Sequence, residues 1–278
     1  MIEINNLTFS YSKNKVFDGL TLSLTKGNVY GLLGQNGVGK TTLLKLLAGL
    51  QQSTKDACVV NGFHPYGRQP EFLQDVFYLP DDPESPTGTI NQFVRHNGPF
   101  YRGFDYKQFR SMMDRFEVNP DEKFKNLSAG QQKKAFISYA LALNTKVLLL
   151  DEPSNGMDIT SKSVFRSIVA GHISEEQVII ISTHQVRDLE NLIDPVIILD
   201  QKQVLLHASI EEITKKLSFI TAAKEEEGVL YSEQTPLGYS MVKANVTGVD
   251  TKVDLEALFN AALQHKEWFK EHFKNGRQ

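Results

Sequence analysis

The chain has 278 residues, 41% of them hydrophobic and 23% charged, and a formal net charge of −3. That length suits one large domain or one domain with an appendage, and so small a net charge gives no general attraction to nucleic acid. The single cysteine, Cys58, excludes an internal disulfide and a cysteine metal site, the N-terminus lacks a signal peptide, and no apolar run approaches the roughly 18 residues of a membrane-spanning helix. We therefore expect a globular protein of a reducing compartment that does not itself cross a membrane.

The predicted strands fall into two classes. Residues 2–9 and 21–24 alternate between apolar and polar, which is typical of antiparallel strands with one face in water. Later runs are short and continuously apolar, as parallel strands covered on both faces are, and they comprise residues 29–33, 147–150, 178–181 and 196–199. Helical patterns at 132–143 and 161–173 lie between these runs. The alternation predicts an α/β fold: a P-loop NTPase core with a mainly parallel sheet, joined to an antiparallel β subdomain and binding ligands beyond the carboxyl ends of its strands.

Residues 34–42, GQNGVGKTT, follow the first buried run and precede an apolar helical stretch. They match the pattern G-x-x-x-x-G-K-[ST] in the strand, loop and helix setting of a P-loop. Glycines without Cβ let the loop wrap an anion with its N–H groups, at the positive end of the following helix. Lys40 would reach the β- and γ-phosphates, and Thr41 would hold Mg²⁺. The candidate phosphate-binding residues are Gly34, Asn36, Gly37, Gly39, Lys40, Thr41 and Thr42.

Residues 83–126 interrupt the alternation of strands and helices. They contain prolines, glycines and many aromatic residues, with helical candidates at 89–97 and 105–117. We expect this stretch to form an inserted α-helical subdomain.

The character of the chain changes again after about residue 220. A charged break at 224–228 precedes a predicted hairpin, with strands at 229–233 and 239–244, and a predicted helix over 252–271 that has one apolar face. We therefore expect a domain over residues 1–220 and a small C-terminal α+β extension over residues 221–278, with a packing or dimer-contact role.

A second motif lies before the helical pattern at 132–143. Ser128 and Gln131 form an S-x-x-Q capping box at an exposed, positively polarised helix end. Taken alone this pattern is an ordinary helix cap, but the next buried run ends in Asp151 and Glu152. An aspartate at the end of such a strand is the expected partner of Mg²⁺ beside a P-loop, and the adjacent glutamate can accept a proton from an attacking water.

These motifs, in this order, resemble an ATP-binding cassette (ABC) ATPase, the nucleotide-binding subunit of an ABC transporter of the bacterial exporter type, over about residues 1–220. The resemblance implies that residues 127–131, LSAGQ, are the family's signature sequence, with Ala129 at a position normally held by glycine. It also implies a head-to-tail homodimer or heterodimer, in which Ser128, Gly130 and Gln131 serve the nucleotide on the partner's P-loop. In the same comparison Glu152 resembles the catalytic carboxylate, and Asp158 the aspartate of the D-loop.

Three further residues complete the resemblance. His184, after the buried run 178–181, matches the family's switch histidine, which contacts the γ-phosphate. Tyr11 matches the aromatic residue that stacks on adenine, although a core role is the alternative. Asp81 stands where the family normally has a glutamine that approaches Mg²⁺. Because a carboxylate also binds Mg²⁺, Asp81 joins Thr41 and Asp151 as a candidate metal ligand.

The function that the resemblance implies is an Mg²⁺-dependent ATPase, with Lys40, Glu152 and His184 as catalytic residues and ATP and Mg²⁺ as its ligands. ATP-driven dimer closure would power a separate integral membrane subunit, docked on the helical insert, and the protein would lie peripherally at the cytoplasmic face of the membrane. Two alternatives remain open. One is a soluble non-transport ABC ATPase, although no nucleic-acid partner is expected. The other is a nucleotide-sensing regulator with weak turnover, which only Asp81 motivates.

Overall fold

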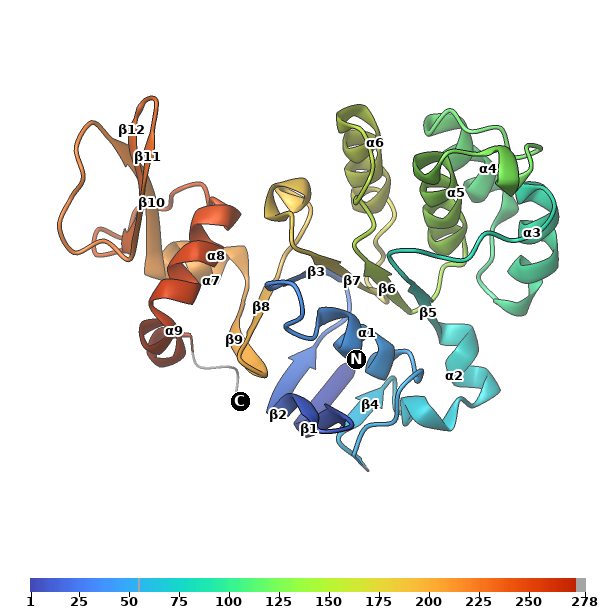
Figure 1. Cartoon of the computed structure of the whole chain (residues 1–278), viewed down its shortest axis with the longest axis horizontal. Coiled ribbons are helices and arrows are strands. Elements are labelled where there is room, and N and C mark those ends of the chain that lie inside the picture. The colour runs from blue at the N-terminus through green and yellow to red at the C-terminus, as the bar shows by residue number, and fades with distance from the viewer. Residues whose placement is uncertain (55, 274–278) are drawn as a thin grey trace.

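A computed structural model describes residues 1–54 and 56–273. These residues are arranged around a six-stranded sheet (Figure 1). The strand order is β5-β6-β7-β3-β8-β9. In that order the strands are Val76–Leu79, Val147–Asp151, Val178–Thr183, Asn28–Leu33, Val196–Asp200 and Gln203–Ala208. Neighbours from β5 to β8 pair in parallel, whereas β9 is antiparallel to β8. The predicted mainly parallel sheet is confirmed, and β9 is an edge strand that the sequence pattern did not single out.

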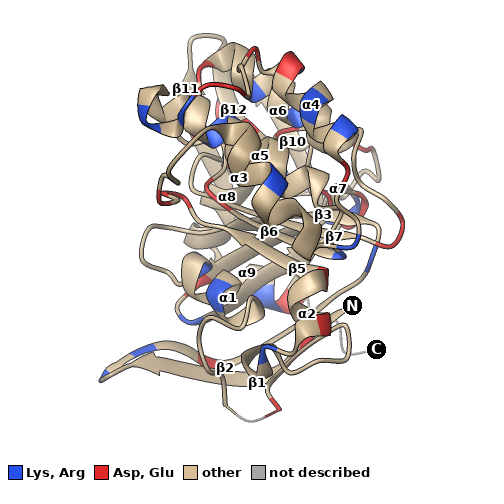
Figure 2. Ribbon diagram, turned by 90° about the vertical axis from the view of Figure 1, so that its right-hand side faces the viewer, with Lys and Arg blue, Asp and Glu red and all other residues tan. Residues whose placement is uncertain are grey.

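A three-stranded antiparallel sheet, ordered β2-β1-β4, forms the second layer. Its strands are β1 (Ile2–Tyr11), β2 (Asn14–Leu24) and β4 (Cys58–Val60). Helix α1 (Lys40–Leu47) lies between this sheet and the six-stranded sheet, as the view in Figure 2 shows. Basic and acidic residues are interspersed along the ribbon in that view. The antiparallel β subdomain is therefore confirmed, and it covers one face of the parallel sheet.

Each face of the parallel sheet packs into its own hydrophobic core. In β6, Val147 and Leu149 belong to the core that contains α1 and the antiparallel sheet. Leu148 and Leu150, which point the other way, belong to the core on the helical side. All four side chains are fully buried, which explains why the sequence of this strand is an unbroken run of apolar residues.

The helical side of the sheet carries the inserted subdomain and two longer helices. The insert contains α3 (Ile90–Asn97) and α4 (Tyr106–Arg115), close to the predicted helices, and the 3-10 turns Gly98–Phe100 and Phe124–Asn126. Thr89 and Asp105 cap the two helices through their side-chain oxygens. Helices α5 (Ala129–Ala142) and α6 (Ile159–Ala170) follow, and α4 packs against α5. The short helix α2 (Pro70–Asp75) leads into β5, after a 3-10 turn at Pro65–Gly67.

The C-terminal extension is a small sheet packed against helices. Its strands, ordered β10-β12-β11, are Leu217–Ala222, Gly238–Ala244 and Tyr231–Thr235, and α7 (Ile210–Lys216) precedes them. The predicted hairpin is confirmed as β11 and β12. The division expected at residue 220 falls within β10, whose partner β12 lies in the extension. Residues 274–278 of the expected extension lie outside the described residues.

The prediction of a single helix over residues 252–271 is wrong, because the chain forms two helices between residues 255 and 272. They are α8 (Leu255–Gln264) and α9 (Lys266–His272), and the chain leaves helical geometry at His265. Buried residues of both helices, including Leu258 and Phe269, join the core on the helical side of the main sheet. None of the helices in residues 1–54 and 56–273 has the length and apolarity that a bilayer span requires.

Candidate active site

Three adjacent strands, β6, β7 and β3, end at the same edge of the parallel sheet. Their register places Asp151 of β6 opposite Ser182 of β7, and Leu33 of β3 opposite Thr183 of β7. The residues that follow these strands therefore meet at one edge although they are far apart in the sequence. This edge carries the P-loop, Glu152 and His184.

The P-loop has the left-handed backbone that its glycines permit. Gly37 and Gly39 have φ angles of 79° and 113°. A Cβ at Gly39 would lie 2.8 Å from Val16 Cγ1 and 2.9 Å from Phe17 Cζ, so only glycine fits between the loop and β2. Helix α1 begins at Lys40, so its positively polarised end faces the loop.

Lys40 is a buried cation within the loop. Its Nζ donates a hydrogen bond to the carbonyl of Gly34 at 2.8 Å and lies 3.7 Å from Glu152 Oε1. Burial lowers the pKa of Lys40, while the carboxylates of Glu152 and Asp151 act in the opposite direction. An ammonium in this setting provides a concentrated positive charge for a phosphate group.

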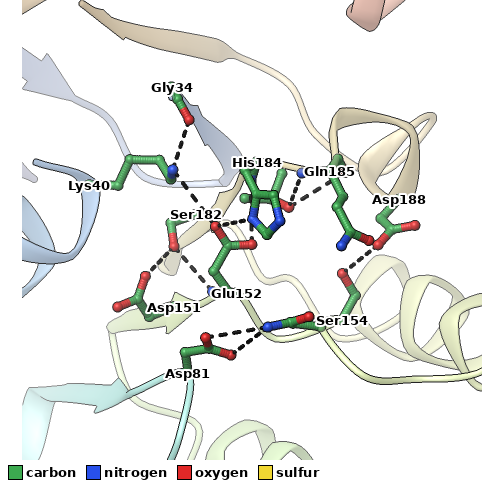
Figure 3. A network of polar contacts seen from close by, with 12 residues as sticks. Gly34, Lys40, Asp81, Asp151, Glu152, Ser154, Ser182, His184, Gln185 and Asp188 are labelled. Carbon is green, nitrogen blue, oxygen red and sulfur yellow. Dashed lines mark hydrogen bonds and ion pairs between the residues drawn. The ribbon is translucent and has the colours of Figure 1, made fainter. Parts of the chain in front are cut away.

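Glu152 joins the P-loop to His184, as Figure 3 shows. His184 Nδ1 lies 2.9 Å from Glu152 Oε1, and the His184 backbone N–H donates to Glu152 Oε2 at 3.3 Å. The glutamate backbone is left-handed, with φ 46°, and its N–H donates to the carbonyl of Ser182 at 3.1 Å. A non-glycine residue in this region stores strain, which is characteristic of functional sites.

Two hydroxyl groups hold the carboxylate of Asp151. Ser182 Oγ donates to Oδ1 at 2.5 Å, and the Tyr78 hydroxyl donates to Oδ2 at 3.1 Å. Burial, together with the charge of Asp151, raises the pKa of Tyr78, so this phenol stays a donor. Asp151 and the hydroxyl of Thr41 supply the hard oxygen ligands that Mg²⁺ prefers, so the residues present fit this ion.

A pocket of about 580 Å³ brings most of the predicted site residues together. It is lined by Tyr11, Asn36, Gly37, Gly39, Lys40, Thr41, Thr42, Asp81, Glu152 and His184, together with Asn14, Val16 and Asn155. Tyr11 is 42% exposed and packs edge-on against Phe9, at 4.9 Å between ring centroids. Its ring is thus available at the pocket, as stacking on a base would require.

The signature residues lie outside this pocket. Ser128 caps α5, because its Oγ accepts from the N–H of Gln131 at 3.3 Å and the Gln131 side chain accepts from the N–H of Ser128 at 3.0 Å. The predicted capping box is therefore confirmed, and Ser128 is exposed. Gly130 lines a separate pocket of about 280 Å³, and Asp158 caps α6 by accepting from the N–H of Ser161 at 2.7 Å. These residues do not meet the P-loop within one chain.

Asp81 lies at the junction of the two pockets and lines both. Its Oδ1 is 2.7 Å from Lys133 Nζ, an ion pair that the sequence reasoning missed. That reasoning also missed Ser182 and Tyr78, which hold Asp151. The available signal was weak: Ser182 directly follows a predicted buried strand, and a lysine on a predicted helix is usually solvated.

We predict that Ser182→Ala lowers kcat for ATP roughly tenfold, because Asp151 loses a charge-assisted hydrogen bond and the N–H of Glu152 loses one of its acceptors. A steady-state phosphate-release assay measures this change. Ser138→Ala is the matched control, since Ser138 is also a fully buried hydroxyl donor but bonds the carbonyl of Lys134 within α5. Equal rates for the parent and Ser182→Ala would contradict the positioning of Asp151 by Ser182.

Comparison with known proteins agrees with this arrangement. A sequence model described as ABC transporter matches residues 17–155, half of the chain. An uncharacterised ABC transporter ATP-binding protein of Methanocaldococcus jannaschii is 28% identical over 272 residues, covering 93% of this chain and 97% of the relative. The cytochrome c biogenesis ATP-binding export protein CcmA of Reclinomonas americana is 31% identical over 191 residues, covering 66% of this chain and 84% of that protein.

The fold has counterparts among solved structures. One described as the ATP binding subunit of an ABC transporter superposes with a TM-score of 0.69 at 22% identity, covering 77% of this chain and 91% of that one. The family match spans the P-loop, the signature sequence and the end of β6 with Asp151 and Glu152. The chain therefore belongs to the ABC transporter family, as an ATP-hydrolysing P-loop NTPase.

Proposed function

We propose that this protein is the energising subunit of a membrane transporter, and that ATP binding, dimer closure and hydrolysis in it move a separate membrane-spanning subunit. The observation that carries the proposal is the contact of Glu152 with both Lys40 and His184 at one edge of the sheet. These three side chains provide a phosphate-binding cation, a general base and a group that reaches the γ-phosphate.

The roles of the residues follow from their chemistry. Lys40 and the N–H groups of the P-loop bind the β- and γ-phosphates of ATP, and Tyr11 stacks on the adenine. Thr41 and Asp151 hold Mg²⁺, which supplies charge neutralisation at the phosphates when bound. Glu152 accepts the proton of the attacking water, and His184 keeps the carboxylate oriented through its ring and its backbone N–H.

The site is half of a composite. Ser128 and Gly130 lie at an exposed helix end away from the P-loop pocket, so within one chain they do not reach a nucleotide bound there. A second subunit, arranged head to tail, brings its own signature residues to this pocket. The positively polarised end of α5, with Gln131 in its capping box, then faces the γ-phosphate. Asp158, at the start of α6, belongs to the same dimer contact.

An apolar groove between the sheet and the helical insert supports docking of a membrane subunit. The groove has a volume of about 490 Å³, and aromatic side chains of β5, the insert and α5 line it, among them Phe77, Phe93, Phe100 and Tyr139. Phe100 is 71% exposed, which is unusual for a phenylalanine that has no partner outside the chain. A cytoplasmic segment of the membrane subunit fills this groove, which places the protein peripherally at the cytoplasmic face. The exporter type is supported by the export function in the name of the Reclinomonas relative.

Lys40→Ala should weaken ATP binding at least about 100-fold, because the buried cation that meets the phosphates is lost. Titration with a fluorescent ATP analogue measures the affinity. Lys45→Ala, a change at a lysine in the last turn of the same helix, is the control and should bind as the parent does. Unchanged affinity in Lys40→Ala would overturn the assignment of the phosphate site.

Glu152→Gln should bind ATP yet hydrolyse it about 100-fold more slowly, because an amide cannot accept the proton of water. The variant should accumulate as an ATP-stabilised dimer, which size-exclusion chromatography with and without ATP detects. A variant that hydrolyses ATP at the parental rate would remove Glu152 from its role. A variant that stays monomeric with ATP would contradict the composite site.

Phe100→Glu should abolish association with an integral membrane protein of the host, because a charge enters the apolar groove. Copurification from detergent-solubilised membranes, followed by identification of the bound protein, tests this. Leu237→Glu is the control, since Leu237 is 86% exposed in the turn between β11 and β12, far along the chain from the groove. A parent that binds no membrane protein would favour a soluble ABC ATPase, and a parent that binds ATP without turnover would favour a nucleotide-sensing regulator.

A further inference from the structure

Lys133 is a buried cation in the second turn of α5, five residues after Ser128. Its side chain is 10% exposed, and burial of an ammonium is costly unless strong acceptors surround it. Three acceptors do so: Asp81 Oδ1 at 2.7 Å, the carbonyl of Glu152 at 3.0 Å and the carbonyl of Asn155 at 3.3 Å. All three hydrogens of the ammonium therefore have an acceptor, and all three acceptors lie outside α5.

The acceptors come from the two segments that flank the candidate active site. Asp81 follows β5, and Glu152 and Asn155 belong to the loop between β6 and α6. Asn155 Nδ2 also donates to both oxygens of Asp81, at 3.3 and 3.4 Å. Lys133, Asp81 and Asn155 thus form a closed polar triangle, and Asp81 and Asn155 line both the P-loop pocket and the pocket beside Gly130.

Lys133 contacts the backbone of Glu152 and not its side chain. Glu152 has a left-handed backbone; Ser182 accepts from its N–H, and Lys133 donates to its carbonyl. The direction of its side chain toward Lys40 and His184 depends on this backbone conformation. A group that fixes the carbonyl therefore helps to fix the direction in which the side chain leaves the backbone.

We propose that Lys133 is a positioning residue for ATP hydrolysis, which orients Glu152 through its carbonyl and ties the signature end of α5 to the catalytic loop, with Asp81 as its counterion. The inference rests on the proposed role of Glu152. It also gives the carboxylate at position 81 a task that does not involve a metal: Asp81 neutralises and orients Lys133.

Loss of Lys133 and loss of Asp81 should affect ATP hydrolysis to different extents. The Asp81 side chain is 44% exposed, so water can solvate it when Lys133 is removed, whereas the carbonyls of Glu152 and Asn155 lose their donor. Removal of Asp81 leaves Lys133 with both carbonyls. Lys133→Met, which keeps an unbranched apolar side chain and removes the ammonium, should therefore impair hydrolysis more than Asp81→Asn.

Steady-state kinetics with the full chain test the proposal. Lys133→Met should lower kcat roughly 10- to 100-fold, with KM for ATP and the affinity for a fluorescent ATP analogue within about threefold of the parent. Lys133→Arg, which keeps a cation, should recover part of the rate. Lys266→Met is the matched control, because Lys266 is 27% exposed and pairs with Asp200 at the same 2.7 Å, and its kcat should equal that of the parent.

A double variant separates positioning from a purely structural role. If Lys133 acts through Glu152, Lys133→Met combined with Glu152→Gln should have the kcat of Glu152→Gln alone. Multiplied losses, or a kcat for folded Lys133→Met equal to the parental value, would overturn the proposal. So would a raised Mg²⁺ requirement in Asp81→Asn with unimpaired Lys133→Met, since Asp81 would then serve the metal.

Different results would remove the positioning role of Lys133 and the catalytic role of Glu152. A slow Glu152→Gln with a parental Lys133→Met removes only the positioning role of Lys133. A Glu152→Gln variant that hydrolyses ATP at the parental rate removes the catalytic role of Glu152 itself, whatever Lys133→Met does.

Discussion

The register of three parallel strands is the constraint on which the rest of this site depends. Asp151 stands opposite Ser182, and Leu33 opposite Thr183, so the chain leaves β6, β7 and β3 at one level of the sheet. A shift of one residue would turn every side chain of a strand to the opposite face, and both faces are buried in separate cores. The packing of those cores therefore also holds the carboxylate of Asp151 against the hydroxyl of Ser182 and brings Glu152 beside His184.

The charges at this edge are stable because they compensate one another. Lys40 and Glu152 are both largely buried, and each would be costly alone. The left-handed backbone of Glu152 adds strain, on the order of 1–3 kcal/mol for such residues. Two hydrogen bonds hold this conformation, one from the N–H to Ser182 and one from Lys133 to the carbonyl. In the catalytic role that we propose for it, a carboxylate held in this way needs little rearrangement when a substrate arrives.

Helix α5 connects the two contributions that one chain makes in the proposed dimer: Ser128 and Gly130 for the nucleotide of the partner, and the loop with Glu152 for its own nucleotide. Its N-terminal end carries the exposed N-cap Ser128 and Gly130, and its second turn carries Lys133 into the polar triangle with Asp81 and Asn155. The contact of Lys133 with the carbonyl of Glu152 therefore joins the helix end that we propose a partner subunit contacts to the loop that carries Glu152. The same helix also contributes Phe136 and Tyr139 to the apolar groove proposed for the membrane subunit.

The sequence by itself determined the helices, strands and motifs that depend on residues close together in the chain. The glycines of residues 34–39, the apolar runs and the capping box at Ser128 each depend on neighbours within a few residues, so pattern alone predicted the P-loop, the parallel strands and the start of α5. The break at His265 was missed, because the apolar face runs through it and only the packing of α8 and α9 decides where the helix ends. Tertiary structure alone decided the partners of Asp81 and Asp151. Lys133 lies 52 residues from Asp81 and Ser182 lies 31 residues from Asp151, and no local pattern encodes contacts that the order and register of the strands create.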